Sequence, residues 1–262
     1  MTANLFSVPP VTRRCWFVWR RNLVVFLKTW RVNFFPPFIE AFLYLTAIGL
    51  GIGTYVQQIG GIPYLNFIAP AILAIAVMNS AFFECTYGSY VRMYYMKTFD
   101  AMIATPLSIE DVIAGELLWG ATRSLMYVTI MLPVLAAFGV ISLPLSLLAI
   151  PLAFFGGLLF AGIAMCFTAV VPSIDTLNYP SFLFITPMML FSGTFFPLTL
   201  LPAVLQYLAV AVLPLTHIVA LLRMLTLPAL SWTGMLNLAW MAVVTAVVCV
   251  LSINLMKRRL IV

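Results

Sequence analysis

The sequence predicts an all-α membrane protein with six transmembrane helices, and two observations lead to that prediction. The mean hydropathy is +1.14, and only 8% of the 262 residues are charged, whereas soluble domains carry about 25%. Apolar runs long enough to cross about 30 Å of hydrocarbon also recur along the whole chain. We therefore expect residues 1–262 to form one integral membrane domain. The four scattered cysteines show no CxxC spacing, so neither a metal site nor a disulfide framework is expected.

The first element, residues 11–31, is predicted to be an amphipathic helix that lies in the membrane surface. On a helical projection its cations share an arc of about 120°, and aromatic and aliphatic side chains fill the opposite arc. The cations are Arg13, Arg14, Arg20, Arg21, Lys28 and Arg31, and the apolar arc holds Trp16, Trp19, Leu23, Phe26, Leu27 and Trp30. Indoles favour headgroup depth, and cations favour anionic lipid. A nucleic-acid-binding helix is the alternative, but this apolar arc argues against it, so we expect no nucleic-acid partner.

Six long apolar segments follow and are predicted to be the transmembrane helices. They cover approximately residues 36–56, 64–92, 110–138, 145–171, 176–194 and 232–255. The first is expected to begin at the Pro36–Pro37 pair, because such a pair suits a helix start and not a helix interior. Residues 195–230 are apolar but are not expected to span. They are interrupted by Pro197, Pro202, Pro214 and Pro228.

The distribution of basic residues predicts the orientation of these helices. With six spans both termini lie on one side of the membrane, and that side receives eleven cations, against one on the other side, Arg223. The eleven are the six N-terminal cations, Arg92, Lys97, Lys257, Arg258 and Arg259. Both termini are therefore expected in the cytoplasm.

The stretch 98–116 is unusual because it holds four of the seven acidic residues in a chain that is 64% hydrophobic. Phe99, Met102 and Ile103 are spaced so that a short helix presents them together, flanked by Lys97 and Asp100. The following Ser-x-x-Asp pattern, from Ser108 to Asp111, predicts the capped start of the next helix. A small apolar patch with charged neighbours suits docking into a groove on a cytoplasmic partner. An ordinary connecting loop remains the alternative.

Several segments resemble the ABC type 2 exporter permeases, and most closely the NodJ branch of that family. The segments are "WRRN" at 19–22, "FEC" at 83–85, "TFDAMIATPLSIEDVIAGELLWGATRS" at 98–124, "PSIDTLNYPSFLFITPMMLFSGTFFPLTLLP" at 172–202 and "LPLTHIVALLR" at 213–223. Their order and spacing both fit, and together they cover nearly the whole chain.

The resemblance implies a single type 2 transmembrane domain in the bacterial inner membrane, working as a pair with two copies of a separate cytoplasmic ATPase. It implies an interface helix at 11–31, a coupling helix at 95–105 seated in the ATPase groove, and an outer re-entrant helical hairpin at 195–228. The coupling residues would be Lys97, Phe99, Asp100, Met102 and Ile103. No cofactor is expected on this chain, and ATP and Mg²⁺ would bind to the partner ATPase.

Three charged residues fall inside predicted spans: Glu84, Glu116 and Arg123. A charge at mid-bilayer costs about 3 kcal/mol on insertion scales, so each is expected to face protein or water. Glu116 and Arg123 are too far apart along one helix to pair directly, but they could bracket Glu84. The group could line a polar pathway or form a gating pair, or it could be a structural pair between helices near the cytoplasmic interface. Glu40 is expected near that interface, paired with arginines of the amphipathic helix.

The outer segment carries the remaining candidate residues for a pathway. His217 is the single histidine. It has no metal partner, and a structural hydrogen bond is expected for it. Arg223 could meet a lipid phosphate or an anionic group of a substrate. Phe191, Phe195 and Phe196 belong to an aromatic and methionine-rich run that suits either an apolar conduit or helix packing within a dimer.

The sequence contains no motif for nucleotide hydrolysis or other catalysis. "GLGIG" at 49–53 lacks the Lys-Ser/Thr ending of a phosphate-binding loop, so it predicts close helix packing. We therefore expect a membrane subunit, not an enzyme, that exports an amphiphilic cargo such as a lipo-oligosaccharide, a lipid-linked glycan or a hydrophobic drug. The alternative is a stand-alone channel or ion-coupled carrier.

Overall fold

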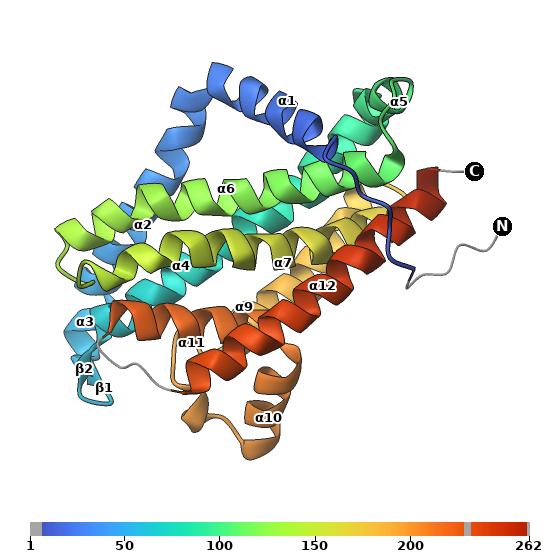
Figure 1. The fold of residues 1–262 in the computed structure, drawn as a ribbon. Helices are drawn as coiled ribbons and strands as arrows, with labels where there is room; N and C mark the ends of the chain where they lie inside the picture. Colours follow the sequence, from blue (N-terminus) through green and yellow to red (C-terminus); the bar gives the residue numbers. More distant parts are fainter. Residues whose placement is uncertain (1–6, 228–231, 261–262) are drawn as a thin grey trace.

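In a computed structural model, which describes residues 7–227 and 232–260, the chain forms a bundle of long helices that lie roughly alongside one another (Figure 1). Within these described residues, five helices are long and apolar enough to cross a membrane, and a bent helix pair would make a sixth. The prediction of an all-α membrane protein is therefore confirmed.

The N-terminal part forms two helices, α1 (Cys15–Lys28) and α2 (Trp30–Leu50), that meet at an elbow at Thr29. The prediction that the first span begins at the proline pair is wrong, because Pro36 and Pro37 lie inside α2. The chain breaks instead at Thr29, where the backbone leaves the helical region (φ −116°, ψ 20°). The Asn33 amide donates to the Thr29 carbonyl oxygen (3.0 Å) and bridges the new helix back to the elbow.

A short hairpin leads from α2 into the central helix. It follows α3 (Ile52–Tyr55) and pairs β1 (Gln58–Ile59) with β2 (Ile62–Pro63). The two turn residues Gly60 and Gly61 both have positive φ (59° and 81°), which glycine adopts without strain. The next helix, α4 (Tyr64–Phe83), therefore runs back alongside α2.

The helix α4 continues beyond its α-helical part through two π-helical segments, η1 (Glu84–Gly88) and η2 (Val91–Tyr95). After Lys97, the one described non-glycine residue with positive φ (51°), the chain turns into the short helix α5 (Thr98–Ile103). The long helix α6 (Ile109–Ala137) follows. It begins at the predicted cap, because the Asp111 amide donates to the Ser108 hydroxyl at 3.1 Å.

The return from α6 runs through η3 (Leu145–Leu148) into α7 (Ala149–Val170), as predicted for the fourth span. The predicted fifth span, 176–194, is a run of short helical segments that ends earlier, at Phe191. The segments are η4 (Asp175–Leu177), α8 (Asn178–Pro180), η5 (Ser181–Ile185) and α9 (Thr186–Phe191). At 1.5 Å per residue the run is about 25 Å long, slightly short of a hydrocarbon core.

The segment after α9 contains η6 (Leu198–Leu200), α10 (Ala203–Val212) and α11 (Pro214–Thr226). The axes of α10 and α11 differ by 88°, so they form a right-angled bend within the segment predicted to be a re-entrant helical hairpin, and that prediction stays untested. Pro228, the predicted end of the segment, lies outside the described residues. The last helix, α12 (Thr233–Leu260), contains the basic cluster that was expected to follow the final span.

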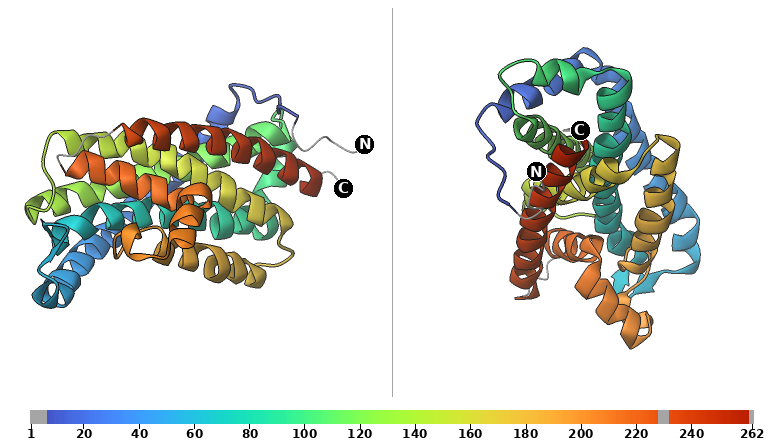
Figure 2. Two further views of the ribbon diagram at one scale, coloured as in Figure 1. Left: turned by 90° about the horizontal axis from the view of Figure 1, so that it is seen from below. Right: turned by 90° about the vertical axis from the view of Figure 1, so that its right-hand side faces the viewer.

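One end of the bundle holds α5 and the C-terminal end of α12, and the other holds the β1–β2 hairpin and the connection from α6 to α7 (Figure 1). We call these the α5 end and the hairpin end. The span that contains α4 is the core of the bundle: 78% of its most apolar stretch is buried, against 22% for α2 and for α12. Seen along the bundle, α2 and the run 175–191 lie on the side away from α12 (Figure 2).

Candidate functional site

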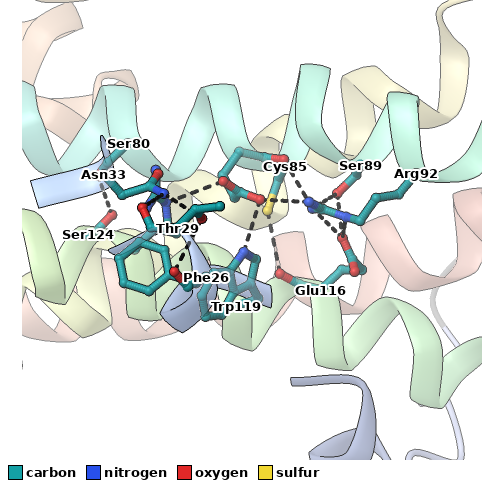
Figure 3. Close-up of polar contacts among 12 residues, drawn as sticks. Phe26, Thr29, Asn33, Ser80, Cys85, Ser89, Arg92, Glu116, Trp119 and Ser124 are labelled. Atoms are coloured by element: carbon teal, nitrogen blue, oxygen red, sulfur yellow. Dashed lines mark hydrogen bonds and ion pairs between the residues drawn. The ribbon is translucent and has the colours of Figure 1, made fainter. Parts of the chain in front are cut away.

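Four charged side chains meet near the α5 end, between the continuation of α4 and the facing turns of α6 (Figure 3). Arg92 is the centre of this charge cluster. Its Nη1 lies 2.8 Å from Glu84 Oε1, and its Nη2 lies 2.6 Å from Glu116 Oε2. Arg123 Nε lies 3.3 Å from the second oxygen of Glu84. Two arginines therefore neutralise two carboxylates.

Neutral donors complete the hydrogen bonding of the two carboxylates. Glu116, which is fully buried, accepts from the Asn22 amide of α1 and from the Ser89 hydroxyl, both at 2.8 Å. The Trp119 indole donates to Glu84 Oε1 at 2.9 Å. Because burying a charge is tolerable only when it is paired and hydrogen-bonded, these contacts explain how the cluster persists inside the helices. They also tie α1 to the bundle.

The backbone brings these groups close together in two ways. Glu84 opens the first π-helical segment and Arg92 lies in the second, and such segments shift side chains from the positions that a regular helix gives them. Small residues then allow close packing. A Cβ at Gly115 would lie 2.5 Å from Val18 Cβ of α1, and one at Gly120 would lie 2.5 Å from Cys85 Sγ. The glycines of α6 thus let α1 and the end of α4 approach it.

The depth of the cluster follows from helix geometry. Glu84 lies twenty residues after Tyr64, the first residue of α4, which is about 30 Å along a helix. Arg123 lies fourteen residues before Ala137, about 21 Å from the hairpin end of α6. Glu84 therefore sits about one hydrocarbon thickness from the hairpin end, near the headgroup region on the α5 side, and Arg123 lies deeper.

The geometry agrees in part with the sequence prediction for these charges. Arg123 does contact Glu84, as the bracketing hypothesis required. Glu116, however, pairs with Arg92, which had been counted only as a cation of the cytoplasmic side. The predicted second span already ended at Arg92, two turns beyond Glu84, but the prediction did not consider Arg92 as a partner for the carboxylates. Whether the cluster gates a pathway or serves only as an inter-helix pair stays a prediction. Glu40, expected to pair with α1, lies in the middle of α2 and forms no ion pair among the described residues.

The predicted apolar patch on residues 95–105 is not a surface patch. Phe99 is fully buried and Met102 is 8% exposed, so the prediction that they form a docking knob is wrong. They pack into the core of this chain, because burying large apolar side chains against the ends of neighbouring helices is favourable. Ile103 is half-buried. The exposed side chains of this region include Tyr95, Met96, Lys97 and Asp100, and we call these four the α5 surface.

The acidic start of α6 is held by partners on both ends of the chain. Asp111 accepts hydrogen bonds from the Thr12 backbone amide (2.6 Å) and hydroxyl (2.9 Å). Glu110 pairs with Lys257 of α12 at 2.6 Å, and Arg14 donates to the Pro106 carbonyl. These contacts therefore fasten the start of α6, just after α5, to both α12 and the segment before α1.

The helix α1 packs on the bundle through a face between the two predicted arcs, where Val18 and Asn22 are buried. Within the predicted helix 11–31, Arg13, Arg14, Arg20, Trp16 and Trp30 are exposed, and its placement in the membrane surface stays a prediction. Trp19, in contrast, turns inward, and its indole donates to the Thr122 hydroxyl at 2.8 Å. Arg21 is half-buried, and burial lowers the pKa of its guanidinium, although the nearby Glu116 carboxylate opposes that change.

The candidate residues of the outer segment are held by contacts within the chain. The His217 ring stacks on Trp240 with 4.0 Å between centroids, and its Nε2 lies 2.9 Å from the Val210 carbonyl oxygen, so the expected structural hydrogen bond is present. Arg223 donates to the Gly193 carbonyl at 2.7 Å and lies 3.8 Å from the Phe67 ring. Whether Arg223 also meets a lipid phosphate or an anionic group of a substrate stays a prediction.

The three phenylalanines of the outer run lie at different depths. Phe191 is 40% exposed, and Phe195 and Phe196 are half-buried. The Phe195 carbonyl accepts a hydrogen bond from the Tyr64 hydroxyl at 3.3 Å. A pathway role for the three side chains stays a prediction.

The fold and the sequence together define a membrane permease. The family described as ABC-2 type transporter matches residues 13–227, and the chain belongs to it. Membrane subunits of this family are not themselves catalytic.

Named relatives support the same assignment. The chain is 35% identical to "Nodulation protein J" of Sinorhizobium fredii over 192 residues, which cover 73% of each protein. It is also 35% identical to "Nodulation protein J" of Rhizobium leguminosarum bv. trifolii over 72% of each chain. It is 27% identical to "Inner membrane transport permease YadH" of Escherichia coli over 73% of this chain and 75% of that protein. The predicted resemblance to the type 2 permeases and to the NodJ branch is confirmed.

Proposed function

We propose that this protein is the membrane subunit of an ATP-driven exporter, which moves an amphiphilic cargo outward across the bacterial inner membrane. The observation that carries the proposal is α5 of a type 2 permease, which is anchored by the buried Phe99 and Met102 and displays a mixed apolar and charged surface at one end of the bundle. Tyr95 and Met96 are each 66% exposed, and Lys97 and Asp100 lie beside them. Exposed apolar side chains ringed by charges are typical of a protein-docking surface.

In this proposal the α5 end is cytoplasmic and the α5 surface seats in a groove of a separate ATPase. The ATPase would bind ATP and Mg²⁺ and carry out hydrolysis. Force on α5 passes directly to the continuation of α4 and to α6, because Phe99 and Met102 are buried in the core between them. The wrong prediction about Phe99 thus strengthens the mechanical argument, since a buried anchor transmits movement better than a loosely attached knob.

The working assembly would contain two copies of this chain and two copies of the ATPase. A self-association surface is available on the side of the bundle away from α12, where α2 and the run 175–191 expose many large apolar side chains. They include Phe35, Phe38, Phe42, Tyr179, Phe182 and Leu183. Membrane lipid would cover whatever part of this surface the second copy leaves free. A path for cargo would open along α2, between the two copies.

The cargo class rests on the relatives. Proteins named for nodulation and for inner-membrane transport share about a third of their residues or fewer with this chain, so we infer a lipo-oligosaccharide, a lipid-linked glycan or a hydrophobic drug. The bent pair α10–α11 would lie in the outer leaflet and help to close the exit. Phe191, Phe195 and Phe196 would line that exit.

A matched pair of tyrosine substitutions tests the proposal. Tyr95 belongs to the α5 surface and Tyr55 lies at the hairpin end, and both are largely exposed (66% and 91%). We expect Tyr95→Asp to release a nucleotide-binding subunit during affinity purification from the native membrane, whereas Tyr55→Asp retains it. Photolabelling with an azido-ATP analogue identifies that subunit.

Two outcomes of this purification and of a transport assay in vesicles contradict the proposal. One is that no nucleotide-binding chain accompanies the wild-type protein while vesicles still transport cargo. The other is that transport follows an imposed ion gradient without ATP, which would favour a stand-alone carrier or channel.

A further inference from the structure

A polar cleft of about 470 Å³ opens between the α1–α2 elbow and the ends of α4 and α6. This volume is within the range of about 300–1,000 Å³ that is usual for small-ligand pockets. The charge cluster forms one wall, with Glu84, Arg92 and Arg123. Arg21 of α1 also lines the cleft, and Thr29 and Asn33 near the elbow add polar side chains to the lining.

The cleft has an excess of positive charge. Three arginines line it against one carboxylate, Glu84, and the Glu116 carboxylate that lies behind Arg92 leaves a net charge of one cation. Arg123 is also incompletely paired. Its Nη1 is buried without a hydrogen-bond partner among the described residues, and its guanidinium carbon lies 5.0 Å from the Phe26 ring centroid. A buried donor without an acceptor costs about 1–3 kcal/mol. An anionic ligand that accepts a hydrogen bond from Arg123 Nη1 would remove that cost.

An apolar cleft of about 220 Å³ adjoins the polar one, and Phe26 lines both. Its other walls are apolar side chains of the elbow and of α6, including Trp30, Phe34, Met126 and Ile130, with Thr129 at its exposed edge. A cationic pocket that continues past one aromatic ring into an apolar groove matches the two chemistries of an amphiphile. Its anionic head would face the arginines, and part of a hydrocarbon chain would lie along α6.

The depth of the cleft identifies the source of such a molecule. Glu84 lies about 30 Å along the helix from the hairpin end, at headgroup level for the leaflet on the α5 side. The exposed apolar side chains of α1, among them Trp16, Phe17 and Leu27, favour contact with the same leaflet. We propose that the elbow cleft is a binding site for one anionic phospholipid of that leaflet, with its phosphate between Arg21 and Arg123. This site lies at the N-terminal end of α2, next to the proposed cargo path, and its occupation by lipid does not depend on ATP-driven transport.

Native mass spectrometry of the complete chain, released from membranes holding equal amounts of phosphatidylglycerol and phosphatidylcholine, tests the proposal. We expect one phosphatidylglycerol to be retained per chain in preference to phosphatidylcholine. Arg21→Gln and Arg123→Gln should each lower that preference about tenfold, the loss expected for a charge-assisted contact. Arg20→Gln is the matched control, because Arg20 is the exposed neighbour of Arg21 and lies outside the cleft.

A second variant probes the apolar cleft. Thr129 is exposed, so Thr129→Trp fills the groove without disturbing the core, and it should reduce retention of both lipids. Equal retention of the two lipids by the wild type would overturn the proposal, as would an equal loss in Arg20→Gln and Arg21→Gln. Displacement of the bound species by excess inorganic phosphate would also overturn it, since the site would then be one for free phosphate. If Arg123→Gln fails to fold, the comparison of lipid retention between Arg20→Gln and Arg21→Gln still tests the proposal.

Discussion

The two ends of the bundle satisfy their buried polar groups in different ways. At the α5 end, Glu84, Arg92, Glu116 and Arg123 neutralise one another across two helices. At the hairpin end, Arg223 has no carboxylate partner among the described residues and is held by the Gly193 carbonyl and the Phe67 ring. The first arrangement joins separate elements through mutual charges, and the second fixes a single turn to the bundle. We therefore expect that substituting one of these residues destabilises several helices at the α5 end but only the adjacent turn at the hairpin end.

The largest effect is expected from Arg92→Ala. The substitution leaves Glu116 buried without a cation and removes one of two partners from Glu84. Breaking a buried ion pair from one side costs about 3–5 kcal/mol, so the variant should lose thermal stability in detergent and expose α1 to proteolysis. Thermal unfolding followed by size-exclusion chromatography measures the change. Arg20→Ala, at an exposed position, is the control and should match the wild type.

A smaller, local effect is expected from Arg223→Ala. The variant loses a charge-assisted hydrogen bond to Gly193, worth about 1.5–3 kcal/mol, and the ring contact with Phe67. Amide hydrogen exchange should rise at residues 192–200 while α1 and α5 keep their protection. Increased exchange throughout the bundle would show that this end is as tightly coupled as the other, and the comparison would then be wrong.

The smallest effect is expected from Glu40→Gln. Glu40 lies in the middle of α2 and has no ion pair among the described residues, so no partner is left exposed when its charge is removed. Stability should therefore not fall, and a change, if measured, should be a gain, because an unpaired charge inside a span is itself costly. The matched variant Glu116→Gln must be clearly destabilised in the same assay. Equal losses in the two variants would mean that Glu40 has a partner in the working assembly.

The spans could be predicted from the sequence because a helix that crosses the bilayer needs a long apolar run, which is visible in the sequence. The bounds of the second, third and fourth spans agree with the helices to within a few residues. The proline pair led to a wrong start for the first span, because Pro36 and Pro37 lie inside α2 and the chain bends at Thr29 instead. Composition offers no rule by which a threonine would break a helix when two prolines do not.

The site was less predictable, for physical reasons. The spacing of Phe99 and Met102 correctly indicated a helical face, but spacing alone cannot tell whether that face meets solvent or the core of the same chain. Arg92 was missed as a partner because it lies in a π-helical segment, which has no clear sequence signature and which shifts side chains from their positions in a regular helix. Glu84, Glu116 and Arg123 were found because a charge inside an apolar span is costly and therefore conspicuous.

Photo-crosslinking from the α5 surface tests the central claim most directly. A benzoylphenylalanine placed at position 96 or 100 in the native membrane should form an adduct with a nucleotide-binding subunit, and the yield should change when ATP is added. The same group at position 55, at the hairpin end, should form none. If positions 96 and 100 crosslink only to lipid or to nothing while the membranes transport cargo, α5 does not receive the force of ATP hydrolysis and the proposed mechanism is wrong.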